Sequence, residues 1–539
     1  MYKIENPILK GFKPDPSILR IESDYYIAVS TFEWFPGVGI YHSTDLNNWK
    51  MLCYPLDDKG KLDMIGIPDS GGIYAPCLSY DKGIFYLIYT NVKNHTGRFW
   101  DCNNYLVTAE NICGPWSDPI YLNSTGIDPS LFHDDDGRKW IVNVVLSHKD
   151  GGKPGFPYWS GISLTEYSPE EMKLIGESKY IFHGSKLGIT EGPHLYKRDG
   201  YYYLLTAEGG TFYNHAVTMA RSKTLEGPYE IDPENPIITS KYDCRIPLQR
   251  TGHADIVETQ TGEWYMVHLC GRPMPSKGRS TMGRETAIQK VKWTDDGWLR
   301  LVNEKHIAEL EVEMPRFLED YVYETVDNKF RDDFNNDILD INWQSLRIPL
   351  PETMCTLKAR PGYLRLFGHE SLSSKFYQSF IAKRQENYCY TVKTCVEFYP
   401  TSFQQMAGVV CYYDTSNYIY LYISSNEVKQ RIINVMINDL NQFSYTLEED
   451  IILPAEGKIF LKAVVNYGIV RFYYSLDAQE WLAVGEDVDY SKLSDEYLKE
   501  RGVERFTGSF VGLCCQDFTC KYIPADFDYF IYQEAPERE

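Results

Sequence analysis

Short aromatic strands recur along the first part of the chain on a long and nearly fixed period. Each alternates apolar and polar positions and follows a turn rich in Gly, Asp or Pro, which is the pattern of a half-buried strand. Their central aromatic residues, 55 to 62 residues apart, are Tyr26, Phe85, Trp140, Tyr202 and Trp264. A repeat with room for about four strands is typical of a propeller blade. The pattern therefore predicts a five-bladed β-propeller over residues 1–316.

The pattern changes after this region. Residues 317–329 lose the repeat and are acidic, which indicates a linker. From residue 330 to 539 alternating strands return with a different rhythm, for example at 407–413, 418–422, 459–464 and 470–474, and a single helix is predicted at 491–501. Many short strands between turns predict a jelly-roll-like β-sandwich. The whole chain is therefore predicted to be all-β.

Composition narrows the classes of partner. The 539 residues carry a net charge of −21, so the surface repels nucleic acid and anionic membranes. Aromatic residues make up 15%, which suits strands and also stacking on a sugar. The 13 Cys form no Cys-x-x-Cys pair, and the sequence shows neither an apolar signal core nor a membrane-spanning run. These features predict reduced cysteines and a cytoplasmic location, and they leave open whether the protein forms a homo-oligomer.

An acidic phrase stands at the same place in several repeats, about ten residues before the aromatic strand. The first repeat has Asp15, the third Asp128, the fourth Glu191 and the fifth His253, whereas the second has only Ala75. The innermost strand of every blade lines the central channel of a propeller, so equivalent positions converge in space. The sequence therefore predicts three carboxylates and a histidine around one axis.

Clustered carboxylates have two main uses. A hard cation such as Ca²⁺ needs six to eight oxygen ligands. Glycoside hydrolysis instead needs an ionised base and a protonated acid on opposite sides of the scissile bond, and crowding of like charges keeps one carboxyl protonated. Positions on non-adjacent blades leave room for a water between acid and base, which favours inversion. A carbohydrate-binding propeller without catalysis is the alternative from another class of function.

Together these phrases resemble glycoside hydrolase family 43, and the region after the linker resembles the C-terminal sandwich of its β-xylosidases. The resemblance covers essentially the whole chain, and its matching segments are 6–9, 15–17, 32–38, 126–130, 190–194, 251–254 and 283–286. It implies that the sandwich covers the active-site face of the propeller. It also implies that Asp15 is the general base that activates water and that Glu191 is the general acid. Asp128 would tune the pKa of Glu191 and orient it.

The resemblance also implies a set of substrate-binding residues. Phe32 would contact the terminal sugar, Arg284 would bond its hydroxyls, and Phe506 would wall the pocket so that the enzyme cuts from chain ends. His253 would lie under the site near the axis, where some relatives hold a water-bound divalent ion. No cofactor is required by this chemistry, and a structural Ca²⁺ near His253 is a further hypothesis.

Several positions in the predicted sugar-binding walls depart from the family pattern. Tyr74 stands where β-xylosidases usually have Trp, Leu146 stands where a pocket Trp is usual, and Trp100 replaces a Lys. The reaction predicted is exo-acting, inverting hydrolysis that releases terminal β-D-xylose from small xylo-oligosaccharides. Because the departures concern the sugar-binding walls, α-L-arabinofuranosides remain the alternative substrate, with one enzyme acting on both as a variant.

Overall fold

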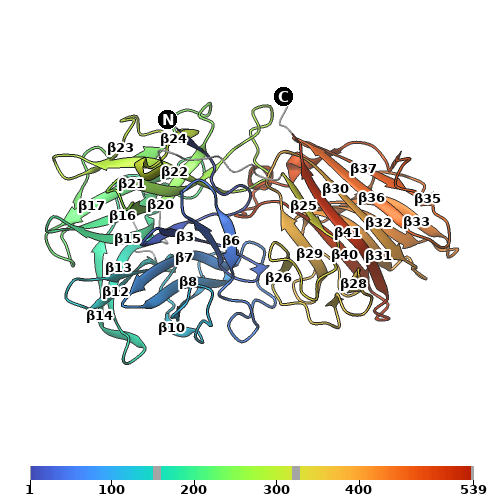
Figure 1. Cartoon of the computed structure of the whole chain (residues 1–539), viewed down its shortest axis with the longest axis horizontal. Helices are drawn as coiled ribbons and strands as arrows, with labels where there is room; N and C mark the ends of the chain where they lie inside the picture. Colours follow the sequence, from blue (N-terminus) through green and yellow to red (C-terminus); the bar gives the residue numbers. More distant parts are fainter. Residues whose placement is uncertain (1, 150–158, 319–327, 536–539) are drawn as a thin grey trace. The chain divides into compact units, whose positions relative to one another are not determined.

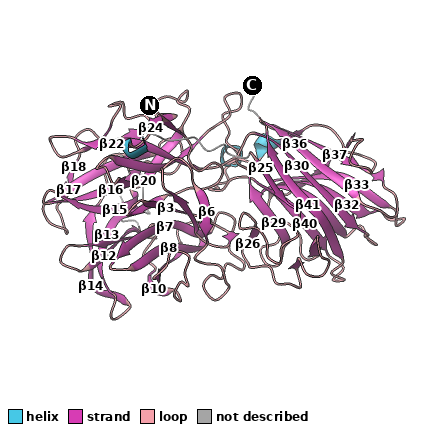
Figure 2. Ribbon diagram, viewed as in Figure 1, coloured by secondary structure: helices cyan, strands magenta, loops and turns pink. Residues whose placement is uncertain are grey.

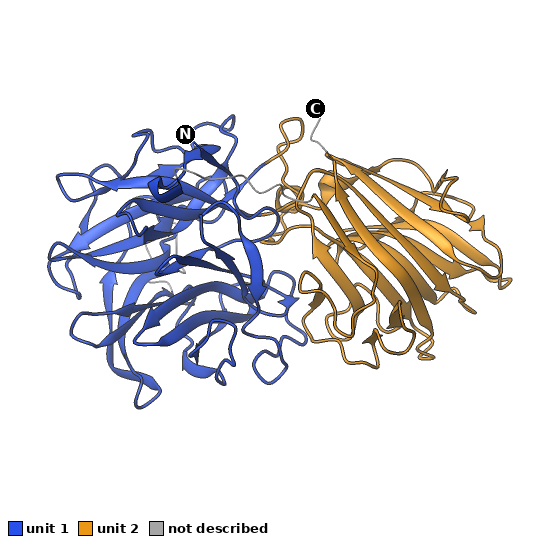
Figure 3. Cartoon of the chain, viewed as in Figure 1, with its two compact units in different colours: residues 1–272, 284–324 blue, residues 273–283, 325–539 orange. Residues whose placement is uncertain are grey.

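The computed structural model describes residues 2–149, 159–318 and 328–535, and nearly every regular element in these ranges is a strand (Figures 1 and 2). The chain divides into two compact units (Figure 3). The first comprises residues 1–272 and 284–324, and the second comprises residues 273–283 and 325–539. Within the described ranges, no helix has the length and apolar character needed to cross a membrane.

The first unit contains five antiparallel sheets that follow one another along the chain, each built from consecutive strands. The first two are β2 (Ser17–Ile21), β3 (Asp24–Val29), β5 (Gly39–Ser43) and β6 (Lys50–Cys53), then β7 (Gly72–Asp81), β8 (Ile84–Asn94), β9 (Asp101–Ala109) and β10 (Ile120–Asn123). The third is β11 (Ser130–His133), β12 (Lys139–Leu146), β13 (Trp159–Ser168) and β14 (Lys173–Phe182). The last two are β15 (Glu191–Arg198), β16 (Tyr201–Glu208), β17 (Ala216–Ser222) and β18 (Glu230–Ile231), with β19 (Ile238–Thr239) on β17, then β20 (Gln249–Glu258), β21 (Trp264–Gly271), β22 (Glu285–Trp293) and β23 (Leu299–Leu301).

The first strands of the five sheets form a closed ring. β2 contacts β7 and β20, β7 contacts β11, and β15 contacts both β11 and β20. These strands are therefore the innermost ones, as in a propeller whose blades surround a central channel. The five-bladed propeller predicted from the repeat is confirmed.

The two ends of the first unit are fastened to each other and to the last blade. β1 (Lys3–Glu5) pairs with β24 (Glu311–Glu313), and Leu9 forms a bridge with Thr286 of β22. The Asn6 side chain donates to the Ile288 carbonyl at 2.7 Å. Two short elements complete the unit, β4 (Trp34–Phe35) and the 3₁₀ turn η1 (Arg316–Leu318). The pairing of distant segments closes the ring of blades.

The repeating aromatic residues pack between neighbouring blades. Tyr26 of β3 lies edge-on to Phe85 of β8, with ring centroids 6.3 Å apart. Trp264 of β21 meets Trp293 edge-on at 5.8 Å in the core between the last two blades. Edge-to-face pairs of this kind add to the burial of apolar area. The high aromatic content of the repeats therefore serves inter-blade packing.

The second unit contains two large antiparallel sheets. In hydrogen-bonded order, one runs β27 (Cys355–Thr356), β28 (Leu364–Phe367), β41 (Pro524–Glu534), β30 (Cys389–Phe398), β36 (Ile459–Asn466), β37 (Ile469–Ser475) and β38 (Leu482–Ala483), with β25 (Lys329–Asp332) on β41 and β39 (Val488–Asp489) on β37. The other runs β34 (Gln442–Tyr445), β33 (Arg431–Asp439), β32 (Asn417–Ser425), β31 (Gln405–Asp414), β40 (Phe510–Asp517), β29 (Ser379–Arg384) and β26 (Gln344–Leu346), with β35 (Ile451–Ile452) on β33. Buried and less buried positions alternate along β36, and the buried ones join a core shared by both sheets. This is the predicted sandwich.

The predicted helix at 491–501 is shorter in the structure. The turn η2 (Tyr490–Lys492) comes first, and α1 spans only Asp495–Lys499. Ser494 separates them because its extended backbone and its side chain, which accepts from the Tyr497 amide, form the N-cap of α1. The N-cap signal within the predicted range explains the later start.

One loop of the fifth blade belongs to the second unit, which the sequence did not indicate. In residues 273–283, between β21 and β22, Arg279 donates to Glu500 at 2.7 Å and the Ser280 amide donates to Glu496 at 3.1 Å. Met274 packs in one cluster with Tyr388. These contacts hold the loop to the second unit. Most of the predicted linker, residues 319–327, lies outside the described residues.

Candidate active site

The predicted carboxylates and histidine lie at the same end of the inner strands. Asp15 and Asp128 each stand two residues before β2 and β11, Glu191 opens β15, and His253 lies within β20. All four are less than one-tenth exposed. The repeat thus brings together side chains that are up to about half the chain apart in sequence.

The backbone takes a left-handed conformation at this position in four blades and one residue later in the fourth blade. The φ angle is 56° at Asp15, 35° at Ala75, 54° at Asp128 and 47° at His253, and the fourth blade uses Gly192 at 55°. Such angles are uncommon for residues other than Gly and are found where the structure over-determines a functional site. We infer that the same backbone turn starts each inner strand and fixes the direction of these side chains.

Asp15 is held as a carboxylate. Arg284 Nη1 donates to its Oδ1 at 2.7 Å, and Ser30 Oγ donates to its Oδ2 at 2.7 Å. Burial raises the pKa of Asp15, but the charge of Arg284, the electrostatic effect of the His253 ring and the Ser30 hydrogen bond outweigh burial and leave the pKa below its usual value. Ser30 Oγ also accepts from the Ala75 amide at 2.7 Å, so the second blade fixes its position. Asp15 is therefore ionised at neutral pH and can accept a proton.

The pKa of Glu191 is shifted in the opposite direction from that of Asp15. Burial, followed by the negative charge of Asp15, raises the pKa of Glu191 to about 8, although Arg284 opposes the shift. A carboxyl group with this pKa keeps its proton at neutral pH. Glu191 can therefore act as an acid beside an ionised Asp15.

Asp128 connects to the segment that carries Glu191. Its Oδ2 accepts a hydrogen bond from the Gly192 amide at 3.0 Å. Burial, followed by the charges of Glu191 and Asp15, holds the pKa of Asp128 well above its usual range. The hydrogen bond to the Gly192 amide lets Asp128 fix the backbone directly after Glu191.

An aromatic wall stands beside Asp15. The Phe32 ring lies 4.4 Å from the Tyr74 ring and 5.3 Å from the Phe12 ring, and the Arg284 guanidinium lies 5.2 Å from the centre of the Phe32 ring. The Tyr74 hydroxyl donates to the Ser70 carbonyl, so it is occupied within its own blade. Phe32, Tyr74 and Arg284 are thus brought together next to Asp15.

The family of the chain follows from comparison with known proteins. Residues 4–299 match the model of Glycosyl hydrolases family 43, and residues 331–533 match that of the Beta xylosidase C-terminal Concanavalin A-like domain. The chain belongs to glycosyl hydrolase family 43.

Relatives of this family 43 chain match it over nearly its full length. A "Beta-xylosidase" of Bacillus subtilis is 48% identical over 99% of this chain and 100% of its own. A "Xylosidase/arabinosidase 43B" of Humicola insolens is 46% identical over 99% of this chain and 98% of its own. The solved structure of a xylan beta-1,4-xylosidase from Bacillus halodurans is 50% identical, with a TM-score of 0.95 over 98% of this chain and 100% of that one. The two-unit architecture is thus shared with proteins of this family.

The structure also describes three other positions of the family 43 chain that the sequence analysis singled out for the sugar-binding walls. Phe506 belongs to the second unit, where it is half-buried in the loop before β40, and the neighbouring Arg505 anchors the loop by donating to Asp414 at 2.8 Å. Leu146 ends β12, and Trp100 lies edge-on to the His95 ring at 5.9 Å. The role of Phe506 as a pocket wall stays a prediction.

The surroundings of His253 do not fit a Ca²⁺ ion held directly by protein oxygens. Burial lowers the pKa of His253 to about 4, so it is neutral. The nearby carboxylate of Asp255 is engaged, because it accepts from Ser17 at 3.0 Å and from Tyr196 at 2.5 Å. Across residues 2–149, 159–318 and 328–535, no group of three or more His, Cys, Asp or Glu side chains could hold a metal ion. Any cation near His253 would depend on water for most of its ligands, and we assign no chemical step to it.

Chelation is therefore expected to leave catalysis intact. Dialysis against EDTA should change kcat/KM on xylobiose by less than about twofold, because six to eight protein oxygens are not available for a tightly held Ca²⁺. The same preparation with added Ca²⁺ is the control. A loss on dialysis that Ca²⁺ restores would contradict this expectation.

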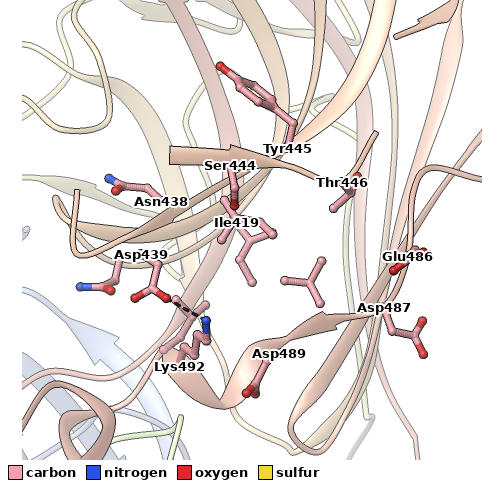
Figure 4. A pocket seen from close by; sticks show the side chains of 14 residues that line it. Ile419, Asn438, Asp439, Ser444, Tyr445, Thr446, Glu486, Asp487, Asp489 and Lys492 are labelled. Atoms are coloured by element: carbon pink, nitrogen blue, oxygen red, sulfur yellow. Dashed lines mark hydrogen bonds and ion pairs between the residues drawn. The ribbon is translucent and has the colours of Figure 1, made fainter. Parts of the chain in front are cut away.

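A cavity in the second unit has polar lining but different chemistry. It measures about 310 Å³, and Figure 4 shows Asp439 and Asp487 on opposite sides of it. Asp439 accepts from Lys492 at 2.7 Å and from Tyr497 at 2.8 Å, and Asp487 accepts from Arg471 at 2.8 Å. These carboxylates are neutralised by structural partners. Asp439 and Asp487 thus contribute to the packing of the second unit.

Two residues of the site were not found from the sequence. Ser30 donates a hydrogen bond to Asp15, and Nε2 of His215 lies 3.5 Å from Oε1 of Glu191. Ser30 follows the second strand of its blade and His215 precedes the third, whereas the repeat signal marks only the starts of the innermost strands. A comparison of all four strands in each repeat is the signal that could have found them.

Proposed function

We propose that this family 43 enzyme is an exo-acting, inverting β-D-xylosidase that removes terminal xylose from xylo-oligosaccharides. The observation that carries the proposal is the pairing of an ionised Asp15 with a protonated Glu191 in one buried site. Hydrolysis of a glycosidic bond requires one carboxyl in each state. The names of the relatives from Bacillus subtilis and Bacillus halodurans support xylose as the sugar.

The chemistry assigns one role to each carboxyl. Asp15 would remove a proton from water as the water attacks the anomeric carbon. Glu191 would give its proton to the leaving glycosidic oxygen from the opposite face. Asp128 would keep Glu191 protonated and placed through the Gly192 amide. Arg284, which is bonded to Asp15, is the proposed donor to the sugar hydroxyls, and Phe32 and Tyr74 are the proposed ring contacts.

Release of α-L-arabinofuranose by the same mechanism is the second candidate. The relative from Humicola insolens carries both activities in its name, which favours a dual specificity in this part of the family. By the resemblance described above, Tyr74 and Leu146 stand where β-xylosidases usually have Trp, so the proposed ring contacts of this chain would differ as well.

The proposed location is a reducing compartment such as the cytoplasm. All 13 cysteines are free thiols, and Cys53 with most of the others is at least partly buried. Disulfides form readily in oxidising compartments, so a chain that contains 13 unpaired cysteines fits a reducing one. Small oligosaccharides taken into the cell would then be the substrates.

Proton NMR of xylobiose digestion tests the proposed reaction. The α-anomer of xylose is expected to appear before mutarotation, because a water activated by Asp15 attacks the face opposite the leaving group. An aryl α-L-arabinofuranoside in parallel measures the second activity. Early β-xylose would contradict inversion and make Asp15 a nucleophile. Binding of xylobiose without turnover would instead indicate a carbohydrate-binding propeller.

A further inference from the structure

One buried histidine of the fourth blade lies against the proposed acid. His215 is fully buried, and its Nε2 lies 3.5 Å from Oε1 of Glu191. Neither of these two atoms has a hydrogen-bond partner among the described residues. Buried polar atoms in proteins nearly always have one. The two unpartnered atoms face each other at the outer limit of a hydrogen bond, and such contacts often tighten when a substrate binds.

Backbone hydrogen bonds and the absence of a side chain at Gly252 fix the position of the His215 ring. The His215 amide donates to the Phe212 carbonyl at 3.1 Å, and Thr239 donates to the His215 carbonyl at 2.7 Å. A Cβ at Gly252 would lie 2.4 to 2.6 Å from three atoms of the His215 ring. Real Cβ atoms do not approach other atoms so closely, so only Gly at position 252 leaves room for the ring. The turn at Phe212 and the strands β19 and β20 thus position the His215 ring next to Glu191.

His215 is uncharged where it lies. Burial, followed by the positive charge of Arg284, lowers the pKa of His215 to about 3. A neutral imidazole carries one N–H and one acceptor nitrogen. The other titratable or charged groups that face His215 and Glu191 are Asp15, Asp128, Arg250, His253, His268 and Arg284.

We propose that His215 is a positioning residue for the general acid and donates its Nε2–H to Oε1 of Glu191 in the substrate complex. The proposal rests on the function proposed above for Glu191. With Oε1 accepting, the carboxyl proton resides on Oε2, where it is available to the leaving oxygen. During cleavage the Oε2–H bond breaks and the proton moves to the glycosidic oxygen. The N–H stays on His215 and stabilises the new carboxylate.

Two substitutions separate the hydrogen bond from the packing of the ring. His215→Phe keeps a planar ring without a donor, whereas His215→Gln supplies an amide donor. For His215→Phe we expect kcat/KM on phenyl β-xyloside to fall about 10- to 100-fold, because the acid is misplaced. The activated 2,4-dinitrophenyl β-xyloside needs little protonation, so its kcat/KM should change less than about threefold.

The pH profile gives a second readout. The lost donor no longer favours the carboxylate in the substrate complex, so the alkaline limb of kcat, which reports the pKa values of that complex, should move up by about one pH unit in His215→Phe. His215→Gln should return the alkaline limb to its wild-type pH. It should also return the ratio of kcat/KM between the phenyl and the 2,4-dinitrophenyl β-xyloside to the wild-type value. Gly252→Ala should reproduce the effect of His215→Phe, because the added methyl group displaces the ring.

His194→Phe is the matched control. His194 is also a buried imidazole, but it lies 3.9 Å from Asp255 rather than beside Glu191, so its loss should change neither readout. Equal losses of His215→Phe on both substrates, with an unmoved alkaline limb, would overturn the positioning role. A His215→Gln variant that is no more active on phenyl β-xyloside than His215→Phe would overturn it as well. A wild-type enzyme that hydrolyses neither xyloside would overturn the proposed function itself.

Discussion

Asp15→Ala is expected to lower kcat at least about 10³-fold on every substrate, including aryl xylosides with good leaving groups. A good leaving group removes the need for an acid, but the attacking water still needs a base. The structure offers this water no equivalent substitute, because Asp128 and Glu191 both have raised pKa values and Asp15 alone of the three has a lowered one. Steady-state rates on xylobiose and on 2,4-dinitrophenyl xyloside measure the effect.

Asp134→Ala is the control for this loss. Asp134 follows the inner strand β11, whereas Asp128 precedes it, so Asp134 is at the other end of the same strand. Its carboxylate is mostly buried and binds Lys197 at 2.6 Å and Tyr202 at 2.9 Å. Its removal should lower thermal stability while kcat stays near the wild-type value. An Asp15→Ala variant that retains kcat on the activated substrate would show that Asp15 is not the base.

Glu191→Ala is expected to separate substrates by their leaving groups. Hydrolysis of xylobiose should fall about 10²- to 10⁴-fold, because its leaving alcohol must be protonated. Hydrolysis of 2,4-dinitrophenyl xyloside should stay within about tenfold of the wild type, since this leaving group departs as a stable anion. Equal losses on both substrates would contradict the assignment of Glu191 as the acid.

The same variant should change the pH profile. In the wild type, the raised pKa of about 8 keeps Glu191 protonated below this pH, so activity on xylobiose should decline as the pH rises through it. Asp15 has a lowered pKa and loses its function only when acid protonates it, which sets the other limb. In Glu191→Ala the residual activity on xylobiose should lose the alkaline limb, whereas the acid limb should remain. A decline near pH 8 that persists without Glu191 would assign that limb to another group.

The sequence contained enough to predict the blades and the three carboxylates. Alternation along each strand and the aromatic period predict how the strands fold locally and how often the unit repeats. A repeat also carries its own geometry, because equivalent residues occupy equivalent places. Asp15, Asp128 and Glu191 could therefore be grouped although no short motif joins them.

Only the tertiary structure decided which carboxyl is charged and what holds it. The pKa of Asp15 depends on Arg284, which is 269 residues away along the chain, and on burial by several blades. His215 and the loop 273–283 likewise owe their places to packing against distant strands rather than to local pattern. Electrostatic interactions and steric fit act through space, so a pattern along the chain determines the elements and their repetition. The charge state of each carboxyl and the side chains that contact it are determined only when the chain is folded.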